Sequence, residues 1–193
     1  MKIYTKRGDL GQTDLFGGGR VSKNSLRVKV FGDIDSANSA IGLAYSIVGS
    51  SNHLKELLEK IMKLLFCAGA EIATAPKDSA INLLKRDLKN HVSQKHIKWL
   101  EDNIDQIEGR LAPLKSFVLP TGSDTAARLH FARTVVRKAE ISLVELKEAG
   151  SDVREEIVIF FNRLSDLLFV MARFANHENS FNDILWDGSL ENA

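Results

Sequence analysis

Apolar residues recur every three or four positions through most of this sequence, and this spacing constrains the fold more than any other feature. It is clearest over residues 54–73, where one helical face is formed by Leu54, Leu57, Leu58, Ile61, Leu64, Leu65, Ala68 and Ile72. The same spacing predicts helices over residues 34–48, 94–107, 125–148 and 154–176. Long amphipathic helices with shorter links are typical of helical bundles, so we predict an all-α, five-helix bundle.

The first 32 residues differ, because their short alternating or β-branched stretches are bounded by glycine. "KIYT" (residues 2–5) and "LRVKVFG" (residues 26–32) are predicted as strands, with Asp33 as the N-cap of the first helix. With 193 residues, 44% of them hydrophobic, the chain is long enough to bury one core. We therefore expect one domain, residues 1–193, made of a short N-terminal β/loop segment (1–32) and a helical bundle (33–186).

Composition excludes several classes of protein. A formal net charge of +1 argues against a broad nucleic-acid-binding surface. The single cysteine, Cys67, cannot form an internal disulfide and is expected to be a small buried side chain, which suits a reducing cytoplasm. No membrane span, export signal or H-E-x-x-H motif is present, so we expect a cytoplasmic protein that builds no metal site of its own.

Residues 5–23, "TKRGDLGQTDLFGGGRVSK", combine five glycines with the cations Lys6, Arg7, Arg20 and Lys23. Glycine lets backbone N–H groups approach a ligand closely, and N–H donors beside cationic side chains suit a polyphosphate. The stretch has neither the Gly-Lys-Ser/Thr ending of a P-loop nor a G-x-G-x-x-G fingerprint. A hairpin turn or a floppy terminus is the alternative interpretation.

Two neighbouring helices each have a stripe of polar residues. Within 125–148 the stripe consists of His130, Arg133, Arg137 and Glu140, and within the very apolar 154–176 it consists of Asn162, Asp166, Phe169 and Arg173. Two arginines on one face repel each other unless an anion lies against them, although they can also pair with carboxylates such as Glu140. Because buried polar groups need partners, the two stripes together predict the wall of a pocket.

The segment "LAPLKSFVLPTGSDTAA", residues 111–127, joins two of the predicted helices and has mixed apolar and turn character. A long irregular connection inside a compact domain is usually functional. Phe117, in the middle of this segment, either fills core space or presses against a flat ligand.

Four separated blocks resemble the PduO-type ATP:corrinoid adenosyltransferase family, and they occur in the family's order. The blocks are "IYTKRGDLGQTDLFGGGRVSK", "GDIDSANSAIG", "LHFARTVVRKAE" and "FFNRLSDLLFVMARFAN". The similarity runs from about Met1 to Trp186, so it covers nearly the whole chain. The resemblance implies a five-helix bundle that assembles as a homotrimer, with active sites between adjacent subunits.

The resemblance also implies an activity: Co(I) of a corrinoid such as cobalamin attacks the ribose C5′ of ATP, with Mg²⁺ present, and triphosphate leaves. The family's nucleotide contacts carry over to Thr5, Lys6, Arg7, Gly8, Thr13, Asp14, Lys23, Arg137, Lys138, Glu140 and Asn162. Asp35 and Arg133 match a pair that braces the corrinoid side of the interface, and Phe117 matches the aromatic residue that displaces the lower axial ligand. The resemblance makes Arg133, Arg137 and Phe117 the expected catalytic residues.

Three positions depart from the family pattern. Lys138 and Ile141 stand where the family usually has arginine, and Ser36 stands where it commonly has glutamate, which bears on phosphate binding and on interface pairing. The expected partners are a flavoprotein or other reductase and an adenosylcobalamin-dependent enzyme, without nucleic acid or membrane. The alternative function is that of a noncatalytic protein that binds ATP or adenosylcobalamin as a sensor or a delivery partner.

Overall fold

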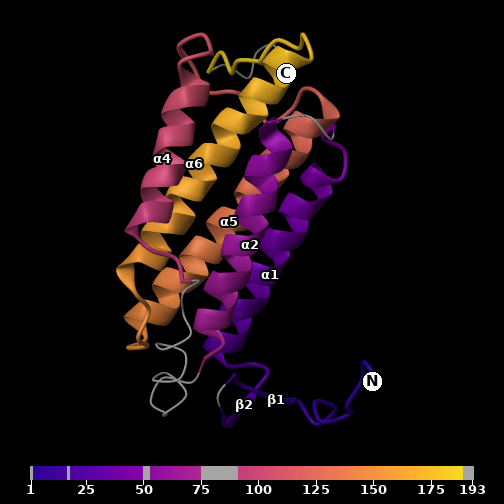
Figure 1. Cartoon of the computed structure of the whole chain (residues 1–193), viewed down its shortest axis with the longest axis vertical. Helices are drawn as coiled ribbons and strands as arrows, with labels where there is room; N and C mark the ends of the chain where they lie inside the picture. Colours follow the sequence, from indigo (N-terminus) through magenta and orange to yellow (C-terminus); the bar gives the residue numbers. More distant parts are fainter. Residues whose placement is uncertain (1, 17, 50–52, 75–90, 189–193) are drawn as a thin grey trace.

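Five roughly aligned helices make up most of the computed structural model, which describes residues 2–16, 18–49, 53–74 and 91–188 (Figure 1). The helices are α1 (Leu26–Tyr45), α2 (His53–Ile72), α4 (Gln94–Glu108), α5 (Asp124–Glu148) and α6 (Glu155–Glu178). Two short antiparallel strands, β1 (Gln12–Asp14) and β2 (Arg20–Ser22), pair Thr13 with Val21 before α1 begins. The predicted all-α, five-helix bundle with a short N-terminal β segment is confirmed.

The N-terminal boundary is where the sequence prediction is wrong. Residues 26–32 begin α1 instead of forming a strand, so Ser25 is the N-cap and Asp33 lies inside the helix. Val30 and Ile34 are buried one helical turn apart, and this packing outweighs the β-branched character of the stretch. Residues 2–5 form no strand either, since they are exposed and outside the β1–β2 pair. The other four helices begin and end within two residues of the predicted bounds.

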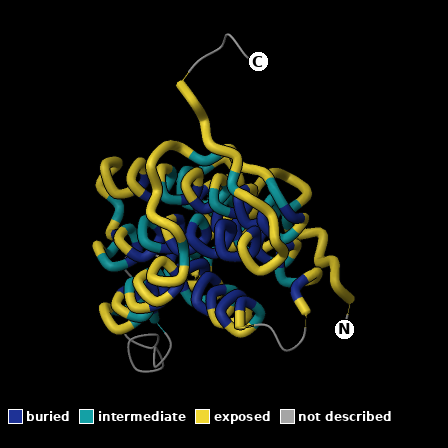
Figure 2. Tube along the Cα trace, turned by 90° about the horizontal axis from the view of Figure 1, so that it is seen from above, coloured by how far each residue is buried: buried dark blue, intermediate teal, exposed yellow. Residues whose placement is uncertain are grey.

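The core lies between the helices, as the view along the bundle shows (Figure 2). α6 packs against α4 and α5, α5 packs against α1, and α1 packs against α2. Every residue of the apolar face predicted for 54–73 is buried, and α6 is buried on most of its circumference. Among the described residues, no helix is both long and apolar enough to cross a membrane.

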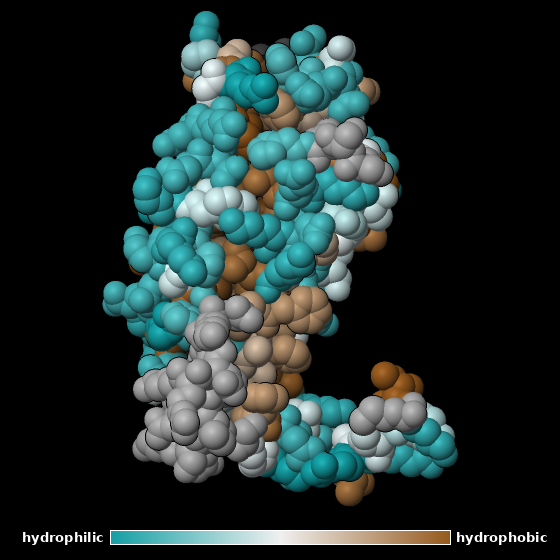
Figure 3. Space-filling model, in the orientation of Figure 1, coloured by the Kyte–Doolittle hydropathy of each residue, from teal (hydrophilic) through white to brown (hydrophobic). Residues whose placement is uncertain are grey.

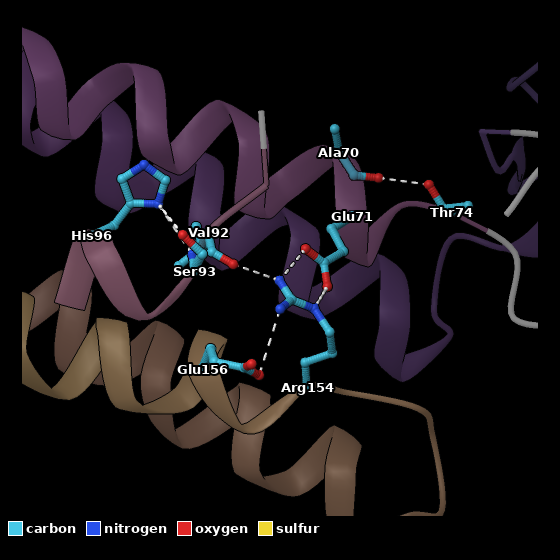
Figure 4. Close-up of polar contacts among 8 residues, drawn as sticks. All are labelled: Ala70, Glu71, Thr74, Val92, Ser93, His96, Arg154 and Glu156. Atoms are coloured by element: carbon cyan, nitrogen blue, oxygen red, sulfur yellow. Dashed lines mark hydrogen bonds and ion pairs between the residues drawn. The ribbon is translucent and has the colours of Figure 1, made fainter. Parts of the chain in front are cut away.

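Arg154, the N-cap residue of α6, joins three segments that are far apart in the sequence (Figure 4). Its guanidinium donates two hydrogen bonds to Glu71 near the end of α2, with N···O distances of 2.6 and 2.9 Å, and a third to the Val92 carbonyl at 2.7 Å. The two side chains are only 33% and 18% exposed. Because the pair is bidentate and half-buried, it holds the start of α6 against the end of α2 more firmly than a surface ion pair would.

Replacing Arg154 should therefore destabilise the bundle. For Arg154→Met we expect the free energy of unfolding to fall by about 1 to 3 kcal/mol, because the Glu71 carboxylate and the Val92 carbonyl lose charged donors. Urea denaturation followed by far-UV circular dichroism measures this loss. Lys63→Met is the control, since Lys63 and Glu59 form an exposed pair that contributes less than about 1 kcal/mol. Equal losses in the two variants would contradict this role of Arg154.

Candidate functional site

The N-terminal arm, residues 2–16 and 18–25, extends from one end of the bundle (Figure 3), and an open pocket lies between the arm and the start of α1. The pocket has a volume of about 490 Å³, and its lining includes Thr13, Asp14, Lys23 and, from α1, Arg27. Three of these residues were predicted to contact a nucleotide. Arg27 was not, because it lies in the stretch that the sequence assigned to a strand; its guanidinium donates to the Ile72 carbonyl at 2.8 Å.

Glycine and lysine pack closely within the arm. A Cβ atom placed on Gly8 would lie 2.9 Å from Nζ of Lys23, so a larger residue here would make the Lys23 side chain shift. The backbone N–H of Lys23 donates to the Gly11 carbonyl at 2.8 Å. The arm thus contains a hairpin, as the alternative interpretation held, and it also places Thr13, Asp14 and Lys23 at the pocket.

Other predicted nucleotide contacts lie on the same arm. Arg7 forms an ion pair with Asp14 at 3.0 Å, and its backbone N–H donates to the Thr5 hydroxyl at 3.4 Å. Lys6 adopts a φ of 60°, in the left-handed region that side chains other than glycine rarely occupy. Thr5, Lys6, Arg7, Gly8, Thr13, Asp14 and Lys23 therefore lie together on one short segment.

Arg133 and Arg137 have no ion-pair partner within the described part of the chain. Glu140, the carboxylate proposed as their neutralising partner, instead accepts a hydrogen bond from Asn162 at 3.0 Å. Nε of Arg133 is buried and has no hydrogen-bond partner, and burial together with the nearby Arg137 lowers the pKa of Arg133. The two guanidinium groups are therefore an uncompensated cation pair, which favours an anionic ligand.

The two polar stripes meet only in part: Asp166 and Phe169 line a pocket with Glu101 and Ile104 of α4, and Arg173 pairs with Asp183, so the pocket wall between the stripes stays a prediction. The stripes meet at the Glu140–Asn162 hydrogen bond and at His130, whose ring lies 6.0 Å from that of Phe169 between centroids. Lys138 belongs to neither stripe, because its ammonium group pairs with Asp33 of α1 at 2.8 Å. Asp35 is exposed, and no ion pair joins it to Arg133 among the described residues. Of the other departing positions, Ile141 is exposed, and the Ser36 hydroxyl donates to the Gly32 carbonyl at 2.8 Å.

Phe117 does not fill the core. Its side chain is 77% exposed, and its ring makes a tilted contact with Trp186, whose centroid is 6.0 Å away. The connection that carries Phe117 lies at the end of the bundle opposite the N-terminal arm (Figure 1). Within one chain, the segment predicted to bind the nucleotide therefore lies at the opposite end of the bundle from Phe117, the residue predicted to act on the corrinoid.

Two further titratable side chains differ in burial: His130 is buried beside Arg133, whereas Cys67, which was expected to be buried, is only half-buried. His130 is 2% exposed, and burial together with the charge of Arg133 lowers its pKa to about 4, so the imidazole is neutral at pH 7. Burial raises the pKa of the Cys67 thiol, which stays protonated and poorly nucleophilic. The described residues contain no group of three or more histidine, cysteine or acidic side chains that could hold a metal ion.

The chain is a helical bundle with a glycine-rich cationic arm and two arginines that have no ion-pair partner among the described residues, and known proteins identify its family. The family described as cobalamin adenosyltransferase matches residues 3–175. Corrinoid adenosyltransferase PduO of Citrobacter freundii is 42% identical over 185 residues, which are 96% of this chain and 53% of that protein. The corrinoid adenosyltransferase of Mycobacterium leprae is 41% identical over 186 residues, 96% of this chain and 95% of that protein.

A solved structure agrees with these matches. A phenylalanine-to-alanine variant of the PduO-type ATP:corrinoid adenosyltransferase from Lactobacillus reuteri, complexed with cobalamin and ATP, superposes with a TM-score of 0.86 at 37% identity. The match covers 96% of this chain and 99% of that chain. The chain belongs to the cobalamin adenosyltransferase family. It spans about half the length of the Citrobacter freundii PduO and nearly all of the Mycobacterium leprae enzyme.

The buried, neutral His130 predicts how stability depends on pH. Between pH 6.5, the ordinary pKa, and about 4, the unfolded chain binds a proton at His130 that the folded chain does not bind. The free energy of unfolding should therefore fall as pH is lowered through this range, by up to about 3 kcal/mol from this residue alone.

The test compares urea denaturation at pH 7 and pH 4.5 in the native chain, in His130→Phe and in the control His53→Gln, whose histidine is exposed at the start of α2. We expect the pH dependence to be weaker in His130→Phe and unchanged in the control. A His130→Phe variant with the full pH dependence would show that another group is responsible.

Proposed function

We propose that this chain is an ATP:cob(I)alamin adenosyltransferase that transfers the 5′-deoxyadenosyl group of MgATP to Co(I) of a corrinoid. The electron pair of Co(I) forms the cobalt–carbon bond while the C5′–O bond breaks, and the electrons of that bond leave with triphosphate. The observation that carries the proposal is the Arg133–Arg137 pair, which no described carboxylate neutralises and in which Nε of Arg133 is buried without an acceptor. Family membership, with relatives named for this reaction, supports it.

The cations of the site stabilise the leaving group. Negative charge grows on the triphosphate as the C5′–O bond breaks, and fixed positive charges aimed at it lower the barrier. Lys6, Lys23 and Arg137 take this role, helped by the Mg²⁺ that accompanies ATP. The remaining nucleotide contacts are Thr5, Arg7, Gly8, Thr13, Asp14, Lys138, Glu140 and Asn162.

The chemistry needs no general base, because the nucleophile is a metal without a proton to lose. This agrees with a site whose nearby histidine, His130, is buried and neutral. What the protein has to supply is access to Co(I), and removing the lower axial ligand makes Co(II) easier to reduce. Phe117 is exposed on its connection, and in this proposal its ring excludes water and base from the lower face of the corrin. Asp35 and Arg133 brace the same side of the site.

The two halves of the site come from different subunits. α5, which has 25 residues, is about 37 Å long, and the N-terminal arm and the connection between α4 and α5 lie at its opposite ends (Figure 1). The reacting carbon and the cobalt have to approach to about 3 Å. The arm and Phe117 of one chain are too far apart to hold ATP and the corrinoid at that distance. The exposed arm instead reaches a neighbouring copy in a homotrimer of single-domain chains (residues 1–193) in the cytoplasm. Size-exclusion chromatography with light scattering should then give about three times the chain mass of 21.4 kDa.

The reaction itself is tested by mixing the protein with MgATP and chemically reduced cobalamin. We expect the corrin absorption spectrum to change to that of adenosylcobalamin, with one triphosphate released for each corrinoid consumed, as measured by phosphorus NMR. Binding of both compounds without product would contradict transfer and would favour a sensor or delivery protein.

Loss of Lys23 should weaken ATP binding. For Lys23→Ala we expect a loss of about 1.5 to 3 kcal/mol in the binding free energy of MgATP, the range for hydrogen bonds to charged groups. Isothermal titration calorimetry measures it. Lys29→Ala removes an equal charge from an exposed position on α1 and should leave the affinity nearly unchanged. An ATP affinity that is the same in both variants would exclude the role of Lys23.

Loss of Phe117 should affect the corrinoid step and leave folding intact. Because the side chain is 77% exposed, Phe117→Ala should change the free energy of unfolding by less than about 0.5 kcal/mol. We expect the spectral band of four-coordinate Co(II) to disappear and activity to fall far more with Co(II) and a reductant than with preformed Co(I). Phe66→Ala, at a 71% exposed position on α2, is the control. Equal loss of activity from both cobalt states would exclude displacement of the lower ligand by Phe117.

A further inference from the structure

The C-terminal segment, residues 183–186, pairs with the connection that carries Phe117. Val118 and Leu185 form an antiparallel bridge. The backbone N–H of Trp186 donates to the Phe117 carbonyl at 2.8 Å, and the N–H of Leu119 donates to the Ile184 carbonyl at 2.8 Å. Two hydrogen bonds therefore fix the backbone from the Phe117 carbonyl to Leu119, although the Phe117 ring is largely free.

A buried ion pair holds this C-terminal segment against α6. Nε of Arg173 donates to Oδ2 of Asp183 at 2.8 Å, and the two side chains are only 6% and 17% exposed. A second guanidinium nitrogen of Arg173 donates to the Ala112 carbonyl at 2.9 Å, at the start of the Phe117 connection. One buried arginine thus joins the C-terminal segment to one end of that connection.

Asn176, one helical turn after Arg173, holds the other end. Its side-chain oxygen accepts from the Ser123 N–H at 2.9 Å, and its Nδ2 donates to the Thr121 carbonyl at 3.1 Å and to Oδ1 of Asp183 at 3.2 Å. Gly122 has a φ of +129°, and a Cβ atom built on it would lie 2.0 Å from Oδ1 of Asn176. The close approach of the backbone to Asn176 therefore requires glycine at this position.

We propose that Arg173, Asn176 and Asp183 are positioning residues that set the place of Phe117 through the backbone. This inference rests on the proposed function, because it concerns the residue that acts on the corrinoid. The three side chains fix the Phe117 connection at residues 112 and 121–123, and they fix the strand that pairs with its middle. The family match ends at residue 175, so Asn176 and Asp183 lie outside it.

A purely structural role would affect stability alone, whereas a positioning role has a specific consequence. Since Phe117 has little side-chain packing of its own, its backbone anchors decide where its ring lies. A displacement of about 1 Å in a positioned group can cost up to about a hundredfold in rate. Loosening the anchors should thus impair the step that needs Phe117 and spare ATP binding.

Asp183→Asn and Trp186→Pro test the proposal in the full-length chain. An amide has one oxygen, so in Asp183→Asn one of the two donors, Arg173 or Asn176, faces an NH₂ group instead of an acceptor. Trp186→Pro removes the N–H that donates to Phe117 and leaves the buried ion pair in place. Hydrogen exchange followed by mass spectrometry should show faster exchange in the peptide that contains Leu119 in both variants, and in the peptide that contains Trp186 in Asp183→Asn.

The functional readout is the four-coordinate Co(II) spectrum together with kinetics. We expect both variants to show a weaker band and a loss of about tenfold or more in kcat/KM with Co(II) and a reductant. With preformed Co(I) the loss should be less than about threefold, and the Kd for MgATP should change by less than about twofold. Glu71→Gln is the matched control, because it weakens a half-buried arginine pair at the other end of the bundle and should leave the Co(II) band unchanged.

The outcomes separate this inference from the proposed function. If the native chain forms adenosylcobalamin and the variants with faster exchange keep the native Co(II) band, these residues do not position Phe117. The same conclusion follows if exchange is unchanged, or if Glu71→Gln loses the band to the same extent as Asp183→Asn. If the native chain forms no adenosylcobalamin, the proposed function fails, while the exchange data still decide whether the three residues anchor the connection.

Discussion

Burial of α6 is the constraint on which the rest of the structure depends. Its surface is apolar over most of its circumference, so α4 and α5 have to cover it. Two polar side chains, Arg173 and Asn176, are nevertheless buried near its end, and buried polar groups are costly unless they are paired. Their partners come from the α4–α5 connection and from the C-terminal segment. Because the buried side chains of Arg173 and Asn176 need hydrogen-bond partners, these two segments come together around Phe117.

Two groups of arginines differ in their ion pairs. One group forms ion pairs that hold the fold together, and the other, at the site, has no ion-pair partner among the described residues. Arg154 and Arg173 are buried or half-buried and donate to both carboxylates and carbonyls, so their charges are compensated. Arg133 and Arg137 have no such partners among the described residues. In a family that acts on a triphosphate ester, cations left uncompensated by the protein are available to its substrate.

The helices could be predicted from the sequence because their apolar spacing is regular, and the polar stripes of α5 and α6 were also visible there. The start of α1 could not be predicted from the sequence. Val28 and Val30 favour a strand locally, and the helix forms there because Val30 packs against the bundle. Asp183 follows the last predicted helix without a pattern of its own, so its pairing with Arg173 depends on tertiary contacts. The exposure of Phe117 could not be predicted from the sequence either, because an aromatic residue in an apolar stretch usually fills the core.

We propose that each site takes its nucleotide segment from one chain and its Phe117 from another. The most direct test is to co-express Lys23→Ala and Phe117→Ala chains with different affinity tags, purify the mixed trimers and measure adenosylcobalamin formation from Co(II) and a reductant. Every mixed trimer should then contain one site with both residues intact, giving about one third of the native activity, although either variant alone is nearly inactive. Mixed trimers as inactive as the single variants would show that both residues act from the same chain and would contradict the account.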